Sequence, residues 1–237
     1  MKVFALPYAG GSAMMYQSWK FNNDKIEFIP LDYAGHGFRF KEPLDESFKK
    51  MVDDVYSQIK PRVYDEEYIL LGHSMGGLVG WYVAQQAARD GINKPKALIV
   101  SATLPPDQYP VESLKELQYS DKLEQYIDKY DRIPAKRRKN KIYVENIFPS
   151  IRNDFEIMSR YEDWSVDTLD IPIHCFYAYS DTLVDCSRIE EWNRRSGIVS
   201  FYKVAGDHFY IETSNGQEKI IDKIKELTNL YLSLIHI

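Results

Sequence analysis

The chain has 237 residues, 44% of them hydrophobic, which suits one α/β domain with a hydrophobic core of its own. A net charge of −5 argues against nucleic acid as the main partner, and two cysteines are too few for a disulfide framework or a structural zinc site. The N-terminal apolar run is too short for a signal peptide and no stretch reaches the roughly 20 apolar residues that cross a bilayer, so we expect a cytoplasmic protein with no membrane partner.

The first half of the chain alternates short apolar strands with helices. Strands are predicted at residues 3–6, 26–31, 68–73 and 97–102. Ser12 is expected to cap a helix after the first strand, and Asp45 a helix over residues 48–59. Gly91 is placed to end the helix that starts near residue 78. Because the strands are apolar throughout rather than alternating, they predict a parallel sheet covered by helices on both faces.

The pattern changes at residues 105–164, which are mostly helical and polar and lack a convincing buried strand. We predict a helical lid inserted into a single domain that spans residues 1–237. Further strands at 171–177 and 199–204 and a helix from about residue 220 complete the domain. The lid carries a basic cluster, which is either a solvated helix face or a docking patch for an acidic partner or a phosphate: Arg132, Lys136, Arg137, Arg138, Lys139 and Lys141.

The stretch around Ser74 organises the whole chain. An apolar strand ends in the sequence Gly72-His73-Ser74-Met75-Gly76 and passes directly into a helix. This strand, tight turn and helix form a nucleophile elbow, which exposes a strained serine above the sheet. Glycines flank the serine because a side chain at either place would collide with the neighbouring strand or helix. The Met75 N–H then points at the site and is a predicted oxyanion donor.

A second oxyanion donor is expected from the loop that follows the first strand. Residues 7–12 read Pro-Tyr-Ala-Gly-Gly-Ser, a glycine-rich turn that leaves backbone N–H groups near the carboxyl edge of the sheet. Ala9 is the first choice for this donor and Gly10 the second. A plain strand–helix turn is the alternative. The loop lacks the G-x-G-x-x-G pattern that binds dinucleotides.

A serine nucleophile needs a histidine base, and that histidine needs a carboxylate to fix its tautomer. His208 follows the last strand and is predicted to be the base. His174 lies inside an apolar strand and is interpreted as packed in the sheet, whereas His36, between two glycines, is expected to shape a turn or a cleft rim.

The predicted acid is Asp181, which comes a few residues after a strand and before the unit that carries His208. Asp185 and Asp207 are the alternatives. Asp185 is better explained as a helix cap, and Asp207 adjoins the histidine, so that its side chain should diverge from it. The predicted catalytic set is therefore Ser74, Asp181 and His208.

With these residues placed, the sequence resembles the stand-alone, or type II, thioesterases of non-ribosomal peptide and polyketide synthesis, which have an α/β-hydrolase fold. The resemblance spans nearly the whole chain. It is carried by residues 6–13 with Tyr16 and Trp19, by residues 72–77, by Pro105 and Pro106, and by the segments around Asp181 and His208. The chain departs from the family at residues 178–180, before the acid, and at residues 33–37, where many members have Pro-Gly.

The resemblance implies hydrolysis of acyl or aminoacyl thioesters on the phosphopantetheine arm of acyl or peptidyl carrier domains, through an acyl-serine. Ser74, Asp181 and His208 would form the triad, and Met75 and Ala9 the oxyanion hole. It implies a housekeeping role for a synthetase. We expect no cofactor beyond the arm on the substrate, and a monomer. The alternatives are a small-molecule carboxylesterase with the same triad and a non-catalytic ligand-binding module on a hydrolase scaffold.

Overall fold

The structure, a computed structural model, describes residues 1–64, 66–129, 136, 139–165 and 168–234. Its centre is a sheet with the strand order β2-β1-β3-β4-β5-β6, in which every neighbouring pair is parallel. The strands are β1 (Lys2–Leu6), β2 (Glu27–Pro30), β3 (Tyr68–His73), β4 (Ala97–Ser101), β5 (Ile173–Tyr177) and β6 (Val199–Lys203). Each lies within about two residues of a predicted strand, so the predicted parallel α/β sheet is confirmed.

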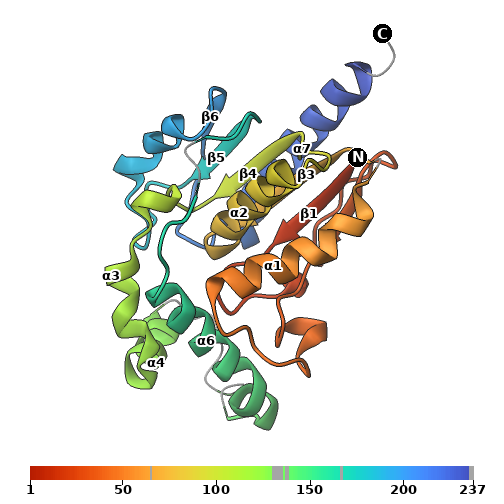
Figure 1. Ribbon diagram of the computed structural model, residues 1–237. Helices are drawn as coiled ribbons and strands as arrows, with labels where there is room; N and C mark the ends of the chain where they lie inside the picture. Colours follow the sequence, from red (N-terminus) through yellow and green to blue (C-terminus); the bar gives the residue numbers. More distant parts are fainter. Residues whose placement is uncertain (65, 130–135, 137–138, 166–167, 235–237) are drawn as a thin grey trace.

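Helices cover both faces of this sheet, as predicted. Helices α1 (Phe48–Ile59) and α2 (Met75–Arg89) lie in front of the strands in Figure 1, and α7 (Ser214–Leu234) crosses behind them. None of the helices in the described part of the chain combines the length and the apolarity that a bilayer crossing needs.

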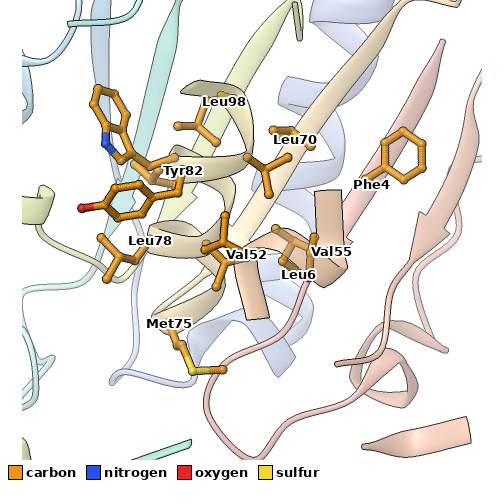
Figure 2. Packing of buried hydrophobic residues seen from close by; sticks show 14 of the residues in the cluster. Phe4, Leu6, Val52, Val55, Leu70, Met75, Leu78, Tyr82 and Leu98 are labelled. Atoms are coloured by element: carbon orange, nitrogen blue, oxygen red, sulfur yellow. The ribbon is translucent and has the colours of Figure 1, made fainter. Parts of the chain in front are cut away.

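The core is split by the sheet into two layers because successive side chains of a strand point to opposite faces. Figure 2 shows the layer under α1 and α2, whose buried members include Phe4, Leu6, Val52, Val55, Leu70, Leu78, Tyr82 and Leu98. The alternate residues Val3 and Ala5 point to the other face and pack with Ile220 and Ile224 of α7. Each buried Val, Leu or Ile side chain among them stabilises the fold by about 1.5–3 kcal/mol.

Two of the predicted helix caps are wrong. Helix α1 is capped by Ser47, whose hydroxyl accepts from the Lys50 N–H at 3.2 Å, rather than by Asp45. Ser12 makes no capping bond, and the helix after β1 is only the 3₁₀ turn Ala13–Tyr16. The Ala13 N–H instead donates to the Asp32 carboxylate at 2.7 Å. Asp32, which is distant in sequence, thus provides the acceptor that the local pattern predicted from Ser12.

The predicted lid segment contains helices and, among its described residues, no strand. Its elements are α3 (Val111–Leu114), a 3₁₀ turn (Lys115–Gln118), α4 (Ser120–Lys129), a π-helical turn (Tyr143–Ile147) and α6 (Phe148–Ser159). A small apolar cluster of Leu123, Ile127, Ile151 and Phe155 holds α4 against α6. In Figure 1 these helices lie below the carboxyl ends of the strands.

The basic cluster of the lid is only partly described. Arg132, Arg137 and Arg138 lie outside the described residues. Lys136, Lys139 and Lys141 are exposed, and the Lys141 ammonium lies 3.8 Å from the Glu145 carboxylate. An exposed pair of this kind contributes little to stability. The choice between a solvated face and a docking patch stays a prediction.

Candidate active site

Ser74 sits at the junction of β3 and α2 in a strained backbone conformation. Its φ of +54° and ψ of −120° lie in a region that L-residues rarely adopt. The surrounding backbone holds this geometry: the Ser74 N–H donates to the Ser101 carbonyl at 2.7 Å, and the Gly77 N–H donates to the Ser74 carbonyl at 2.9 Å. Strain of this kind persists only where neighbouring structure imposes it, and it is concentrated at functional sites.

The two glycines of the motif are required by close backbone approaches. A Cβ atom on Gly72 would lie 2.5 Å from the Gly77 nitrogen and closer still to the Gly76 carbonyl. A Cβ atom on Gly76 would lie 2.6 Å from the Pro7 carbonyl oxygen and closer still to the Leu6 carbonyl. Backbone atoms at both places leave no room for a side chain. This is the steric collision that the sequence predicted at these two glycines.

His208 and Asp181 are in direct contact. The His208 Nδ1 lies 2.8 Å from the Asp181 Oδ2, and both side chains are buried. The other carboxylate oxygen accepts from the Leu183 N–H at 2.8 Å and from the Val184 N–H at 3.0 Å, so the carboxylate is held at both ends. Because the carboxylate accepts at Nδ1, the imidazole carries its proton there and keeps Nε2 as the basic nitrogen.

The alternative residues are placed elsewhere. Asp185 caps the 3₁₀ helix Cys186–Arg194 by accepting from the Ser187 N–H at 3.1 Å, as predicted. Asp207 accepts from the Phe209 N–H at 2.9 Å and so closes its own turn. His174 is buried in β5 beside the Tyr202 hydroxyl, and burial lowers the pKa of its imidazole to about 4.

Ser74 and His208 line the same cavity, which has a volume of about 160 Å³. The loop after β1 contributes Ala9 to its wall, and the lid contributes apolar side chains, among them Leu114, Leu117, Phe155 and Met158. A largely apolar chamber with a serine hydroxyl and an imidazole on its wall suits a substrate with an apolar acyl group. Within the described residues, no group of three or more His, Cys, Asp or Glu side chains is arranged to hold a metal ion.

Two backbone N–H groups, those of Met75 and Ala9, are the oxyanion donors predicted from the sequence. Among the described residues, no acceptor is found for the N–H of Met75, at the start of α2, or for that of Ala9. Gly10, the second choice in the sequence analysis, donates its N–H to the Asp154 carboxylate at 2.7 Å. The Gly10 N–H is therefore occupied, which leaves Ala9 as the better candidate of the two.

His73, the residue before Ser74, has no role predicted from the sequence. Its Nε2 lies 2.9 Å from the His208 carbonyl oxygen, to which it must donate, and its Nδ1 lies 2.8 Å from the Ser101 Oγ. The Tyr210 hydroxyl lies 2.6 Å from the same Oγ. This buried chain fixes the loop that carries the base relative to β3 and β4. No local sequence pattern predicts these hydrogen bonds, because the residues that make them come from three separate segments.

Comparison with known proteins identifies the family. The model of the thioesterase domain matches residues 1–228. The chain belongs to the thioesterase family. This enzyme is 25% identical over 227 residues to the medium-chain S-acyl fatty acid synthase thioesterase of Homo sapiens, covering 93% of this chain and 84% of the human one. It is also 25% identical over 218 residues to the gramicidin S biosynthesis protein GrsT of Aneurinibacillus migulanus, covering 90% and 84%.

Among solved structures, the thioesterase is similar to ClbQ from the colibactin NRPS/PKS pathway. The TM-score is 0.86 at 27% identity, covering 99% of this chain and 98% of that one. The α/β-hydrolase fold and the resemblance to stand-alone thioesterases predicted from the sequence are confirmed. The chain is an enzyme that hydrolyses thioesters, as its family does.

Proposed function

We propose that this thioesterase removes acyl or aminoacyl groups from the phosphopantetheine arm of carrier domains, with Ser74 as nucleophile, His208 as base and Asp181 as the residue that orients it. The carboxylate–imidazole contact of 2.8 Å, with its imidazole in a cavity that the elbow serine also lines, carries the proposal. The match to the thioesterase family and to proteins such as GrsT and ClbQ supports a substrate carried by a synthetase. The role would be to clear misprimed or stalled carriers.

Acylation begins when the Ser74 oxygen attacks the thioester carbonyl carbon and its proton moves to the His208 Nε2. The carbonyl oxygen becomes an oxyanion and accepts from the N–H groups of Met75 and Ala9, each worth about 3 kcal/mol in the transition state. The C–S bond then breaks. The pantetheine sulfur leaves with the proton from His208, and the acyl group stays on Ser74.

Deacylation repeats the sequence with water. His208, neutral again, takes a proton from a water molecule as its oxygen attacks the acyl-serine carbonyl. The same two N–H groups receive the second oxyanion. When the ester bond breaks, the Ser74 oxygen regains its proton from His208, and the carboxylic acid departs. Throughout, Asp181 keeps the Nδ1 proton in place and stabilises the imidazolium.

The lid segment would form the apolar wall that receives the acyl chain. Leu114, Leu117, Phe155 and Met158 all face the cavity that Ser74 lines. The phosphopantetheine arm is long and thin, so a carrier domain outside the lid could present the thioester without entering the cavity. An apolar wall also limits water at the reacting carbonyl, which strengthens the oxyanion interactions.

The deciding experiment follows acyl release from loaded carriers by mass spectrometry. Holo-carrier domains carrying acetyl, longer acyl or aminoacyl groups are incubated with the enzyme, and the mass of each carrier is followed with time. We expect the wild type to restore free holo-carrier and Ser74→Ala to leave the acyl group in place. Labelling of Ser74 by a fluorophosphonate should be lost in His208→Ala.

The same preparation is offered p-nitrophenyl esters. A much higher kcat/KM on the simple ester than on any loaded carrier would favour a small-molecule carboxylesterase. Binding of acyl-carrier without turnover, together with an unreactive Ser74, would favour the non-catalytic module.

A further inference from the structure

A buried ion pair connects the lid to the loop after β1. The Asp154 carboxylate of α6 is fully buried, and its Oδ2 lies 3.0 Å from the His36 Nε2. The same oxygen accepts from the Gly10 N–H at 2.7 Å. The other ring nitrogen of His36 lies 2.9 Å from the Ala34 carbonyl oxygen, which fixes the ring. One carboxylate oxygen of α6 therefore binds both the loop after β1, at Gly10, and the segment around His36.

The His36 imidazole is protonated at neutral pH. Burial alone would lower the pKa of the His36 imidazole, but the charge and hydrogen bond of Asp154, together with the Ala34 carbonyl and Asp32, raise it to about 9. Because both ring nitrogens then donate, His36 fits the carboxylate on one side and the carbonyl on the other. Two charges this deep in the protein are stable only with such geometry.

Stability alone gives a poor account of Asp154. Its Oδ1 is buried and has no hydrogen-bond partner among the described residues. Buried carboxylate oxygens normally have partners, and an unpartnered one destabilises the fold. An apolar side chain would suit a plain contact between α6 and the body better. The carboxylate therefore needs a reason beyond packing, and its bond to Gly10 supplies one.

The loop after β1 depends on α6 for its conformation. Gly10 has a φ of +73°, and a Cβ atom there would lie 3.1 Å from the Cβ of Ile151 and closer to its Cγ1. Asp154 and Ile151 are three positions apart on α6 and so face the loop together. Since the peptide unit between Ala9 and Gly10 is planar, the bond from the Gly10 N–H to Asp154 also sets the orientation of the Ala9 carbonyl.

We propose that Asp154, held in place by His36, is a positioning residue for the oxyanion hole, which it orients by fixing the peptide unit that follows Ala9. The proposal rests on the function proposed above, in which the Ala9 N–H stabilises the oxyanion. Asp154 itself touches no reacting atom. It acts through the backbone of residues 9 and 10. With the peptide unit after Ala9 held, the Ala9 N–H, which belongs to the preceding peptide unit, can turn relative to it only through the φ and ψ angles of Ala9, so its alignment depends on the docked position of α6.

The test is steady-state hydrolysis of a soluble S-acyl pantetheine by Asp154→Ala and Asp154→Asn. Each rate is divided by the concentration of active sites, measured as the amount of enzyme that a fluorophosphonate labels when the reaction has gone to completion. Loss of one oxyanion donor costs about 10²- to 10³-fold, so a misaligned donor should lower kcat by about tenfold or more in Asp154→Ala. KM should stay within about twofold, because the ground-state carbonyl gains little from the donor. Asp154→Asn keeps an acceptor oxygen and should lose less.

A transition-state analogue separates positioning from a general loss of stability. A trifluoromethyl ketone adds to Ser74 and places an oxyanion in the hole, so its affinity should fall by the same factor as kcat/KM. The matched control is Asn153→Ala, the neighbouring residue on α6, whose side chain donates to the Asp45 carbonyl at 3.0 Å and makes no hydrogen bond to the loop after β1 among the described residues. Its kcat per titrated site should stay within about twofold.

A double variant tests the link to His36. If His36 acts only through Asp154, then His36→Ala combined with Asp154→Ala should lose no more activity than Asp154→Ala alone. The proposal is overturned if Asp154→Ala and Asp154→Asn both turn over at the wild-type rate per site, if the loss appears in KM, or if Asn153→Ala loses as much. Those results leave the proposed function standing, whereas full activity of Ser74→Ala would overturn the function itself.

Discussion

Asp181→Asn is the substitution that tests the site most directly, because it changes one atom and forces a proton onto the wrong nitrogen. The Oδ1 of Asp181 accepts from two backbone N–H groups, of Leu183 and Val184. An asparagine must keep its only oxygen there. Its amide NH₂ then faces the His208 Nδ1, where it can only donate. The imidazole must move its proton to Nε2 and can no longer accept one from Ser74.

The expected cost is large for activity and small for stability. A serine hydrolase that loses its orienting carboxylate in this way loses about 10⁴-fold in kcat. The two backbone N–H groups keep their acceptor in Asp181→Asn, so we expect its free energy of unfolding to change by only about 1 kcal/mol. Asp181→Ala, in contrast, leaves both N–H groups without an acceptor and should lose stability as well as activity.

The assay is thioester hydrolysis on a loaded carrier, with urea denaturation of the same samples. Asp185→Asn and Asp207→Asn are the matched controls, since each side chain accepts from a backbone N–H two residues further along its own turn. Both should keep kcat within about twofold. If Asp181→Asn retained more than about a tenth of the wild-type kcat, or if either control lost about 10³-fold, the assignment of the acid would be wrong.

Three further predictions concern residues that support the site without touching the substrate. Gly76→Ala should destabilise the protein by about 3 kcal/mol and abolish activity, because its methyl group would overlap two backbone carbonyl oxygens; circular dichroism during heating and the thioester assay measure this. The pKa of His36 is raised to about 9, so the stability gained from its pair with Asp154 should be fully present below about pH 6.5 and lost as the pH rises to about 9. Urea denaturation of the wild type and His36→Gln should therefore give free energies that converge over that interval. Tyr210→Phe removes the hydroxyl bonded to Ser101 and should cost about 1–3 kcal/mol of unfolding free energy, measured in the same way.

The parts of the site that the sequence predicted are those with a local cause. The elbow is readable because glycine spacing and an apolar strand leave few other conformations for Ser74. The order of strands and loops then restricted the acid and base to a few residues, and the structure places Asp181 and His208 in contact. Strand positions followed from apolar runs that a parallel sheet buries on both faces.

The features that the sequence did not predict depend on contacts between distant segments. Ser12 matched the pattern of a helix cap, yet the Ala13 N–H donates to the Asp32 carboxylate and the Ser12 side chain makes no capping bond. Asp154 looks like any polar residue of a lid helix, and its partner His36 lies 118 positions away. Residue type alone cannot reveal such pairs, because tertiary packing rather than local preference decides them.

The bond from His73 to the carbonyl of His208 has a consequence for how the catalytic groups move. His73 is covalently attached to Ser74, so one residue connects the nucleophile to the loop that carries the base. Thermal displacement of the end of β3 should carry both groups in the same direction and preserve their separation. Small fluctuations of the central sheet during turnover should therefore leave the distance between Ser74 and His208 nearly unchanged.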